Sequence, residues 1–500
     1  MSNKVKQLSK ALSLTPIALA VILSGCSIAP DYDQQETFET TTLVESYLYT
    51  ASENQTIDSN HWWRQFEDET LNTMIEDVQQ QNIPLQVAAQ RIKMAQGYQS
   101  VVESFKVPTV SVGAGYFNYQ LSKNDSLMGP ALNPIGDSVA NLPPALGNMT
   151  LLEADHDGGF VGASIAWEVD LFNRIDHQAN AAAIRVEQAQ IYQNGLVTLI
   201  SADLVHNYLQ YRGAERRIEL VKANLDDQAK TMRLIEKVVR SGYGSDLDLA
   251  QAQTMLAATE SLLPQLEIAQ QAHKQRLATL LGEPLSAVDI RLASDEGLHD
   301  IKGVIPVGLP SELLQRRPDI QIAEREMAAI NQELAASIAN RYPKFFLTGA
   351  PGVSASSFGD LFSSDSFGWV GSAGVHWNVF DGGRGEAMVD INQARFESAA
   401  LGYQHSVNAA VAEVDSMLFA YGRSQENEAR MQDAVLASKH AVNKAKSLYR
   451  AGLIDHLSVL DAQRQSRVIE DRQVAAKLQT AQVTVGLFKA LGGDWQVSAQ

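Results

Sequence analysis

Side chains that commonly carry catalysis or bind metal ions occur in this sequence, but their spacing does not form a reactive site. The ten histidines are scattered, and no His-Glu-x-x-His motif, Cys/His ligand spacing or Gly-x-Ser-x-Gly motif is present. Gly382-Gly383-Arg384-Gly385 has a weak similarity to a phosphate-binding loop. The equivalent segment of an internal repeat, residues 173–176, has no glycine, so a strand-to-helix bend explains both better. We expect no catalytic activity, no cofactor and no metal.

The one cysteine, Cys26, has surroundings that specify a covalent modification. Lysines near the N-terminus precede an apolar stretch, Ala11 to Leu23, that is too short to span a bilayer as a helix. It ends in Leu-Ser-Gly-Cys, which resembles a bacterial lipobox, whose small residues give a signal peptidase access. We expect residues 1–25 to be removed and Cys26 to be lipidated; the alternative is a buried apolar thiol. Ser27 is typical of sorting to the outer membrane.

The composition limits the classes of function. The 500 residues carry a formal net charge of −18, which argues against nucleic-acid binding because phosphate contacts need clustered Lys and Arg. An apolar content of 45% is sufficient for a packed fold. Beyond the signal no uninterrupted apolar run of about 18 residues occurs, so membrane-spanning helices are not expected, whereas strands of a membrane barrel show only alternation. The carboxylates follow helical surfaces and indicate a solvated or cation-tolerant lumen.

An internal repeat covers most of the chain. Residues 167–282 align with residues 377–492 at a constant offset of 210, without an insertion. Upstream, Pro84 and Pro108 correspond to Pro318 and Pro343, with offsets of 234 and 235. The difference of about 25 residues must lie between the two strands of each copy, where a variable loop is expected. The matched residues include Trp167/Trp377, Val169/Val379, Arg174/Arg384, Arg240/Arg450, Gly242/Gly452, Leu247/Leu457, Ala252/Ala462, Gln253/Gln463, Leu281/Leu491 and Gly282/Gly492.

Each copy contains two candidate strands. Residues 160–171 and 367–379 alternate between apolar and small or polar side chains, and residues 109–119 and 345–353 do so more weakly. Alternation is compatible with a soluble sheet that has one face on a core, or with an outer-membrane barrel that has lipid outside and water inside. The lipoprotein signal and the helices that follow favour the barrel.

Each copy also contains one very long helix. Residues 174–240 hold no proline, and their apolar residues recur at helical spacing, which predicts a helix roughly 100 Å long. A glycine turn follows, and a return helix is expected over residues 246–282, with a shorter helix over 84–106. The two shorter helices together match the long one and could lie end to end beside it. The second copy predicts the same order with residues 384–450, 455–492 and 319–342.

Four strands in one chain cannot close a barrel, since about eight are the practical minimum. An open four-stranded sheet in lipid would leave the backbone groups of its edges unpaired, at a cost of several kcal/mol each. The sequence therefore predicts an oligomer.

Three segments carry a family resemblance. The mature N-terminus, Cys26 to Tyr32, is followed by Trp62-Trp63-x-x-Phe66-x-Asp68; residues 309–320 read LPSELLQRRPDI; and residues 449–464 combine Tyr-Arg-x-Gly with Leu457 and Leu-Asp-Ala-Gln-Arg. These motifs are similar to those of the TolC/OprM outer-membrane factor family, most closely its lipidated OprM-like branch, and the resemblance extends over nearly the whole mature chain.

The resemblance implies an α+β membrane channel built from two tandem repeats. Its fold would be a trimeric 12-stranded outer-membrane β-barrel, with four strands per chain, continued by a long periplasmic α-helical coiled-coil barrel. The homotrimer would contact outer-membrane lipid, a periplasmic adaptor (membrane fusion protein) and an inner-membrane RND-type pump. The expected function is the passive exit duct of a tripartite efflux pump for drugs or other toxic small molecules. The alternatives are the duct of a type I protein secretion system and a structural coiled-coil lipoprotein without a pore.

The resemblance also places a periplasmic gate at the second helix tip, on Tyr449, Arg450, Leu457, Asp461 and Arg464. Hydrogen bonds and ion pairs among the polar members would hold neighbouring tips together, and Leu457 would form a constriction. Ser458 departs from the TolC-like branch, which often has an acid there. The alternative is that these residues only cap and solvate a turn. Gly242 and Gly452 are expected to supply turn conformations with positive φ.

The expected organisation assigns residues 1–25 to the signal peptide and 26–80 to an N-terminal anchor and equatorial segment. Residues 81–290 form the first repeat and residues 318–493 the second. A linker, 291–317, joins them, and 494–500 form a C-terminal tail.

Overall fold

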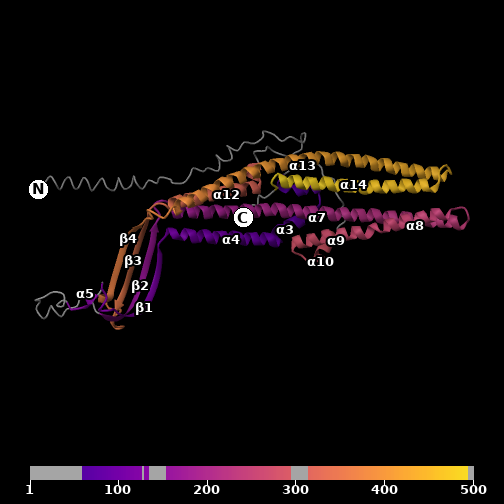
Figure 1. The fold of residues 1–500 in the computed structure, drawn as a ribbon. Coiled ribbons are helices and arrows are strands. Elements are labelled where there is room, and N and C mark those ends of the chain that lie inside the picture. Colours follow the sequence, from indigo (N-terminus) through magenta and orange to yellow (C-terminus); the bar gives the residue numbers. More distant parts are fainter. Residues whose placement is uncertain (1–58, 127–128, 135–153, 294–312, 494–500) are drawn as a thin grey trace. The chain divides into compact units, whose positions relative to one another are not determined.

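The computed structural model of the chain describes residues 59–126, 129–134, 154–293 and 313–493. They form two compact units (Figure 1). Within the described chain, the first unit comprises residues 97–183 and 329–396, and the second comprises residues 59–96, 184–328 and 397–493. Both units therefore draw on both copies of the repeat.

The first unit contains a four-stranded antiparallel sheet whose strands follow chain order (Figure 1). The strands are β1 (Thr109–Gln120), β2 (Asp155–Val169), β3 (Lys344–Ala355) and β4 (Phe367–His376). Each overlaps one of the four segments in which alternation predicted a strand, although β2 begins five residues before the predicted range and β4 ends three residues before the end of its predicted range. The sheet therefore combines the two strands of one copy with the two strands of the other.

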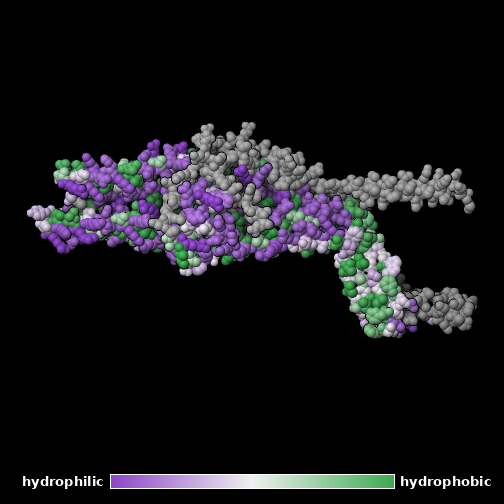
Figure 2. Space-filling model, turned by 180° about the vertical axis from the view of Figure 1, so that it is seen from behind, coloured by the Kyte–Doolittle hydropathy of each residue, from purple (hydrophilic) through white to green (hydrophobic). Residues whose placement is uncertain are grey.

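The register places most of the apolar side chains of the four strands on one face. Val112 is paired with Ala163, Ile165 with Gly349, and Pro351 with Trp369. Because side chains alternate between the faces, the small and polar residues, such as Ser111, Ser164 and Thr348, share the opposite face. Figure 2 shows hydrophobic residues gathered over the strands, whereas hydrophilic residues predominate over the long helices.

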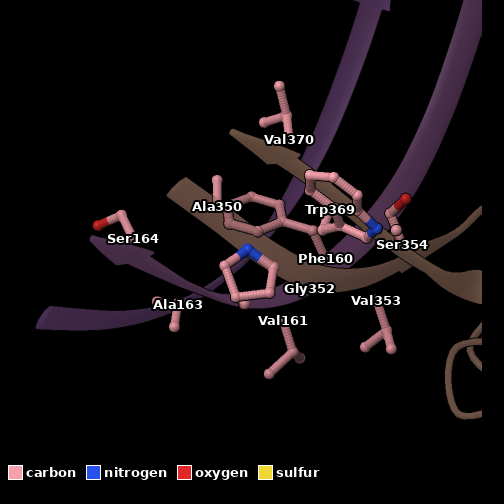
Figure 3. A pocket seen from close by; sticks show the side chains of 14 residues that line it. Phe160, Val161, Ala163, Ser164, Ala350, Gly352, Val353, Ser354, Trp369 and Val370 are labelled. Atoms are coloured by element: carbon pink, nitrogen blue, oxygen red, sulfur yellow. The ribbon is translucent and has the colours of Figure 1, made fainter. Parts of the chain in front are cut away.

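A row of glycines crosses the sheet on this second face. Gly113, Gly162, Gly352 and Gly368 are partners in successive strand pairs, and they border a hollow of about 460 Å³. Figure 3 shows Phe160 and Ala350 on one side of the ribbon and Val161 and Val353 on the other, and all four residues line the hollow. A Cβ at Gly162 would lie 2.9 Å from the Pro351 carbonyl oxygen, so the two central strands require glycine for their close approach.

The long helices agree with the sequence-based prediction at both ends. Helices α7 (Arg174–Arg240) and α13 (Arg384–Arg450) each contain 67 residues, which corresponds to roughly 100 Å at 1.5 Å per residue. The shorter helices are α4 (Ile83–Glu103) and α12 (Pro318–Ala339), and Pro84 and Pro318 stand in their first turns, where a missing N–H costs little. No helix among the described residues is long and apolar enough to cross a membrane.

The prediction for the return helix of the first copy was wrong. A single helix was expected over residues 246–282, but the structure has α8 (Asp246–Glu260) and α9 (Leu262–Leu281). Pro264 explains the break, because its ring clashes with the carbonyl four residues earlier, that of Glu260, and it cannot donate a hydrogen bond. The second copy has Val474 at the equivalent position, and α14 (His456–Ala490) is continuous.

Within the second unit, the C-terminus of each return helix meets the start of a short helix. Asn82, immediately before α4, donates through Nδ2 to the Leu280 carbonyl oxygen at 2.7 Å. Arg317, immediately before α12, donates through Nη1 to the Ala490 carbonyl oxygen, also at 2.7 Å. The two acceptors are separated by the repeat offset of 210 residues. Different side chains thus satisfy equivalent free carbonyls at helix C-termini, and the end-to-end arrangement predicted from helix lengths is observed.

Two α-helices of the second unit that have at least eight residues were not predicted. Helix α3 (Glu69–Gln81) buries Leu71, Met74, Ile75 and Val78 against the core that contains Leu204 and Leu277, and its apolar spacing after an Asp N-cap was a readable signal. Helix α10 (Leu285–Leu292) follows α9. The remaining short elements are η1 (Ser59–Phe66), η2 (Ser104–Lys106), α5 (Gly129–Leu132), α11 (Leu313–Arg316) and η5 (Ser364–Ser366).

Candidate channel wall and helix-tip gate

The apolar face of the sheet is open to the surroundings of the chain. Val112, Trp369 and Val375 are 80%, 76% and 63% exposed. A sheet that packed on a soluble core would bury this set of side chains. A continuous exposed apolar face requires a nonaqueous cover, which favours lipid over the soluble alternative.

The two copies fix one end of their strand pair in the same way. The indole Nε1 of Trp167 donates to the Lys106 carbonyl oxygen at 3.1 Å, and that of Trp377 donates to the Arg341 carbonyl oxygen at 2.9 Å. Both acceptors stand two residues before the proline that precedes a strand. Each tryptophan therefore joins one strand end to the entrance of its partner strand, and its ring remains available to an interface.

The glycine-rich segment before α13 is a capped turn. Gly382 and Gly383 have φ of +71° and +85°. The Asp381 carboxylate accepts hydrogen bonds from the backbone N–H of Gly383 at 3.1 Å and of Gly385 at 2.8 Å. A carboxylate of the chain itself occupies the position at the helix N-terminus that an anion would take, so these residues form a strand-to-helix turn.

The helix tips at the ends of α7 and α13 are built alike. Gly242 and Gly452 have φ of +80° and +70°. At the first tip, Tyr243 N–H donates to the Val238 carbonyl and Gly242 N–H to the Val239 carbonyl. Equivalent bonds form at the second tip. These are Schellman motifs, in which a left-handed residue ends the helix and satisfies its last carbonyls. The N-caps differ, with Ser245 before α8 and Asp455 before α14.

Two of the predicted gate residues face a cavity that both tips share. Tyr449 and Leu457 line a space of about 180 Å³ together with Tyr243, Val238 and Leu460. Below it, Leu460 packs with Ile235 and Ala252. The structure therefore brings the aromatic and aliphatic gate residues beside the first tip, and Leu457 remains 48% exposed.

The charged members of the predicted gate lie on the outside of the second tip. The Arg464 guanidinium donates to the Asp461 carboxylate at 2.6 Å, and both side chains are more than half exposed. Arg450 is also exposed. An exposed pair one helical turn apart contributes about 0–1 kcal/mol. The residues are thus accessible to a second chain, and their function as a gate remains a prediction. Cys26 and the residues expected to form a signal peptide, 1–25, lie outside the described residues.

Sequence reasoning did not assign a structural function to the Arg317-Pro318-Asp319 segment. The Arg317 guanidinium bonds both carboxylate oxygens of Asp319, at 3.0 and 2.7 Å, and pairs with Glu413 at 2.8 Å. Burial alone would raise the pKa of Asp319, but the hydrogen bond and charge of Arg317 outweigh it and lower this pKa. Together with the bond to Ala490, these contacts join the start of α12 to α13 and α14.

The Trp62-Trp63-x-x-Phe66-x-Asp68 motif also has a structural role. Trp62 stacks on Phe488, with ring centroids 5.1 Å apart. The Asp68 carboxylate caps α3 by accepting a hydrogen bond from Leu71 N–H at 2.8 Å. It also accepts a hydrogen bond from the Tyr208 hydroxyl at 2.5 Å. Burial, followed by this carboxylate, raises the pKa of the Tyr208 hydroxyl. The motif therefore docks the N-terminal segment on α7 and α14.

Comparison with known proteins agrees with this architecture. The family model described as "Outer membrane efflux protein" matches residues 74–283 and 309–493. The chain belongs to the outer membrane efflux protein family. The pyoverdine export outer membrane protein OpmQ of Pseudomonas putida is 28% identical over 90% of this chain and 91% of its own length. The toluene efflux pump outer membrane protein TtgI of Pseudomonas putida is 26% identical over 97% and 98%.

Solved structures show the same fold. The outer-membrane channel OprN matches with a TM-score of 0.80 and 29% identity, over 94% of this chain and all of that one. This family member is therefore an outer-membrane efflux component with the α+β fold of the trimeric outer-membrane channels, as the sequence predicted. It is a component of transport systems, and its exit-duct function places it in the outer membrane with a large periplasmic part.

Proposed function

We propose that three copies of the chain form a continuous passive duct that conducts toxic small molecules out of the cell. The exposed apolar face of the sheet, opposite a face of small and polar residues, is the observation that carries this proposal. In a closed wall the first face contacts lipid and the second contacts water. Among the described residues, the outer strands β1 and β4 each pair on one side only, and pairing them between three chains gives twelve strands and removes the open edges.

The duct receives its cargo from a periplasmic adaptor and an inner-membrane RND-type pump. Two helices of roughly 100 Å, each ending in an exposed tip, support this assignment. Tyr243, at 89% exposed, and Leu453, at 70% exposed, provide apolar contact area at those tips. The pump provides the energy, and the chain provides the conduit.

The second helix tip acts as the gate in this proposal. Leu457 narrows the passage, Tyr449 and Asp461 bond neighbouring tips, and the exposed arginines Arg450 and Arg464 contribute ion pairs. Such pairs are individually weak, so an adaptor can release them. Cys26 carries a lipid anchor that supplements the strands in holding the trimer in the membrane.

Efflux of small molecules is favoured over type I protein secretion by the named relatives, which serve pyoverdine export and toluene efflux. For this chain, we test the proposal with purified protein in planar bilayers. Discrete ion conductance is expected, and a well-folded trimer without conductance would refute the duct and favour a structural lipoprotein. Deletion of the gene should sensitise the cell to a panel of antibiotics, detergents and bile salts, whereas secretion of a protein substrate alone would favour type I secretion.

A further inference from the structure

The second unit contains a cavity that the duct proposal does not use. It measures about 590 Å³ and lies between α7, α8, α9 and α14, which is within the size range of small-molecule sites. Four of its lining residues are arginines and one is an aspartate, although the whole chain carries a net charge of −18. The charged residues of the lining are Arg217, Arg464, Arg467, Arg472 and Asp471.

One arginine in this cavity has a buried N–H donor without a hydrogen-bond partner among the described residues. The Nη1 of Arg467 is buried and has no hydrogen-bond partner among the described residues. By contrast, Arg217 makes two bonds to Asp471, at 2.6 and 3.0 Å. Burial lowers the pKa of the Arg467 guanidinium, and the nearby carboxylates of Asp227 and Glu470 only partly oppose this effect. A buried guanidinium N–H normally has an acceptor, so a missing acceptor marks a place for an anionic oxygen.

A second unpaired group lies in the same lining. Gln228 is 6% exposed, and its Nε2 donates to the Thr259 hydroxyl at 3.0 Å. Its Oε1 is buried without a partner among the described residues. Two unpaired polar groups in one lining are unusual, because buried polar atoms are generally satisfied, and they indicate space for an occupant. An anionic oxygen can accept from Arg467 Nη1, whereas the Gln228 oxygen needs a donor such as water.

The rest of the lining is apolar and determines which kind of anion fits. Aliphatic side chains from three helices cover the wall on either side of the arginines; they are Leu220, Val221, Leu262, Leu266, Ala269 and Val468. A bare inorganic ion would leave this surface in contact with water. Asp471 in the lining also disfavours a multiply charged ligand. An apolar body that carries one carboxylate satisfies both requirements.

We propose that this cavity binds an amphipathic organic monocarboxylate, with its carboxylate on Arg467 Nη1 and its apolar body against the aliphatic wall. Arg472 and Arg464 add favourable charge at the rim. The site goes beyond the duct, since its walls are helix surfaces within a single chain and its occupation does not depend on the passage of cargo.

The test uses the full-length trimer in lipid nanodiscs and the soluble probe 4-butylbenzoate, followed by isothermal titration calorimetry against empty nanodiscs. The neutral 4-butylbenzamide and the cationic 4-butylbenzylamine have the same body. We expect the benzoate to bind at least about tenfold more tightly than either, since a charge-assisted hydrogen bond is made only by the anion. Equal binding of the amide would overturn the proposal. Competition by inorganic phosphate as strong as that by the benzoate would also overturn it.

Two substitutions identify the site. Arg467→Gln should weaken benzoate binding at least about tenfold and leave the weak binding of the amide unchanged, while Arg423→Gln, an exposed arginine on α13, should change neither. Ala258→Trp should fill the cavity from an exposed position and abolish binding of all three probes. This variant tests the site even if Arg467→Gln folds poorly. Unchanged benzoate binding in these variants would refute the site. If the parent protein does not bind the benzoate and Arg467→Gln makes the trimer less stable, the proposal is wrong and Arg467 Nη1 contacts a neighbouring chain instead.

Discussion

Removal of the Arg317 side chain should loosen the joint between α12 and α14 without unfolding the chain. In Arg317→Ala, the buried Ala490 carbonyl loses its donor, which costs about 1–3 kcal/mol. The ion pairs to Asp319 and Glu413 add less, about 0–1 kcal/mol, because those carboxylates are 53% and 35% exposed. With both contributions near the middle of their ranges, the expected loss of local stability is about 2–3 kcal/mol.

Hydrogen–deuterium exchange with mass spectrometry measures this loss at the joint. Peptides that cover residues 313–328 and 484–493 should exchange roughly 30- to 150-fold faster, since 1.4 kcal/mol corresponds to a factor of ten. Arg317→Lys should give an intermediate change, because an ammonium retains the charge but cannot form the two-pronged contact. Arg216→Ala removes an exposed ion pair with Glu219 and serves as the control. A folded Arg317→Ala protein with exchange within threefold of the parent would show that the carbonyl is satisfied by water and that the reasoning is wrong.

Three further predictions address the sheet, the pH dependence and the gate. Gly162→Ala should destabilise the β2–β3 pair by about 1–3 kcal/mol through overpacking, which would lower the temperature of heat modification in gel electrophoresis. Gly368→Ala, with open space around its Cβ, should leave that temperature unchanged. Equal effects of the two substitutions would refute the close-approach argument. Burial lowers the pKa of His273, and nearby His206 adds a smaller lowering. The neutral imidazole therefore contributes its full stability to the fold above the unfolded pKa of about 6.5, and this contribution is lost as the pH falls through the lower folded pKa. His273→Gln should flatten the decline of the apparent melting temperature between pH 7 and 5, and an unchanged slope would exclude this histidine. Combining Asp461→Ala with Tyr449→Phe should raise single-channel conductance, and a folded double variant with parental conductance would remove both residues from the gate.

The local structure of this chain could be predicted because its signals are local. Gly242 and Gly452 follow the long helices, and a left-handed glycine ends a helix whatever packs around it. Alternation located the strands for the same reason, since its period belongs to the strand itself. The unpredicted break after Glu260 also had a local cause, Pro264, which the prediction of one continuous return helix did not take into account.

The candidate site was only partly predictable. A family resemblance selected Tyr449 and Leu457, but their position beside Val238 and Leu460 depends on the packing of the two tips. Nothing in the spacing of Gln228 and Arg467 indicates that residues more than two hundred positions apart line one cavity. Two partners of Arg317, Ala490 and Glu413, are likewise distant in sequence, because they belong to other helices.

The sequence by itself determined that the chain is duplicated, where its long helices end and which side chains alternate. These properties follow from periodicity and from the conformational limits of glycine and proline, which act over a few residues. The tertiary structure decided that the four apolar strand faces coincide and remain exposed, and that the C-termini of equivalent return helices are capped by an asparagine in one copy and an arginine in the other. Register and long-range hydrogen bonds depend on which segments meet, and that choice is made only when the whole chain packs.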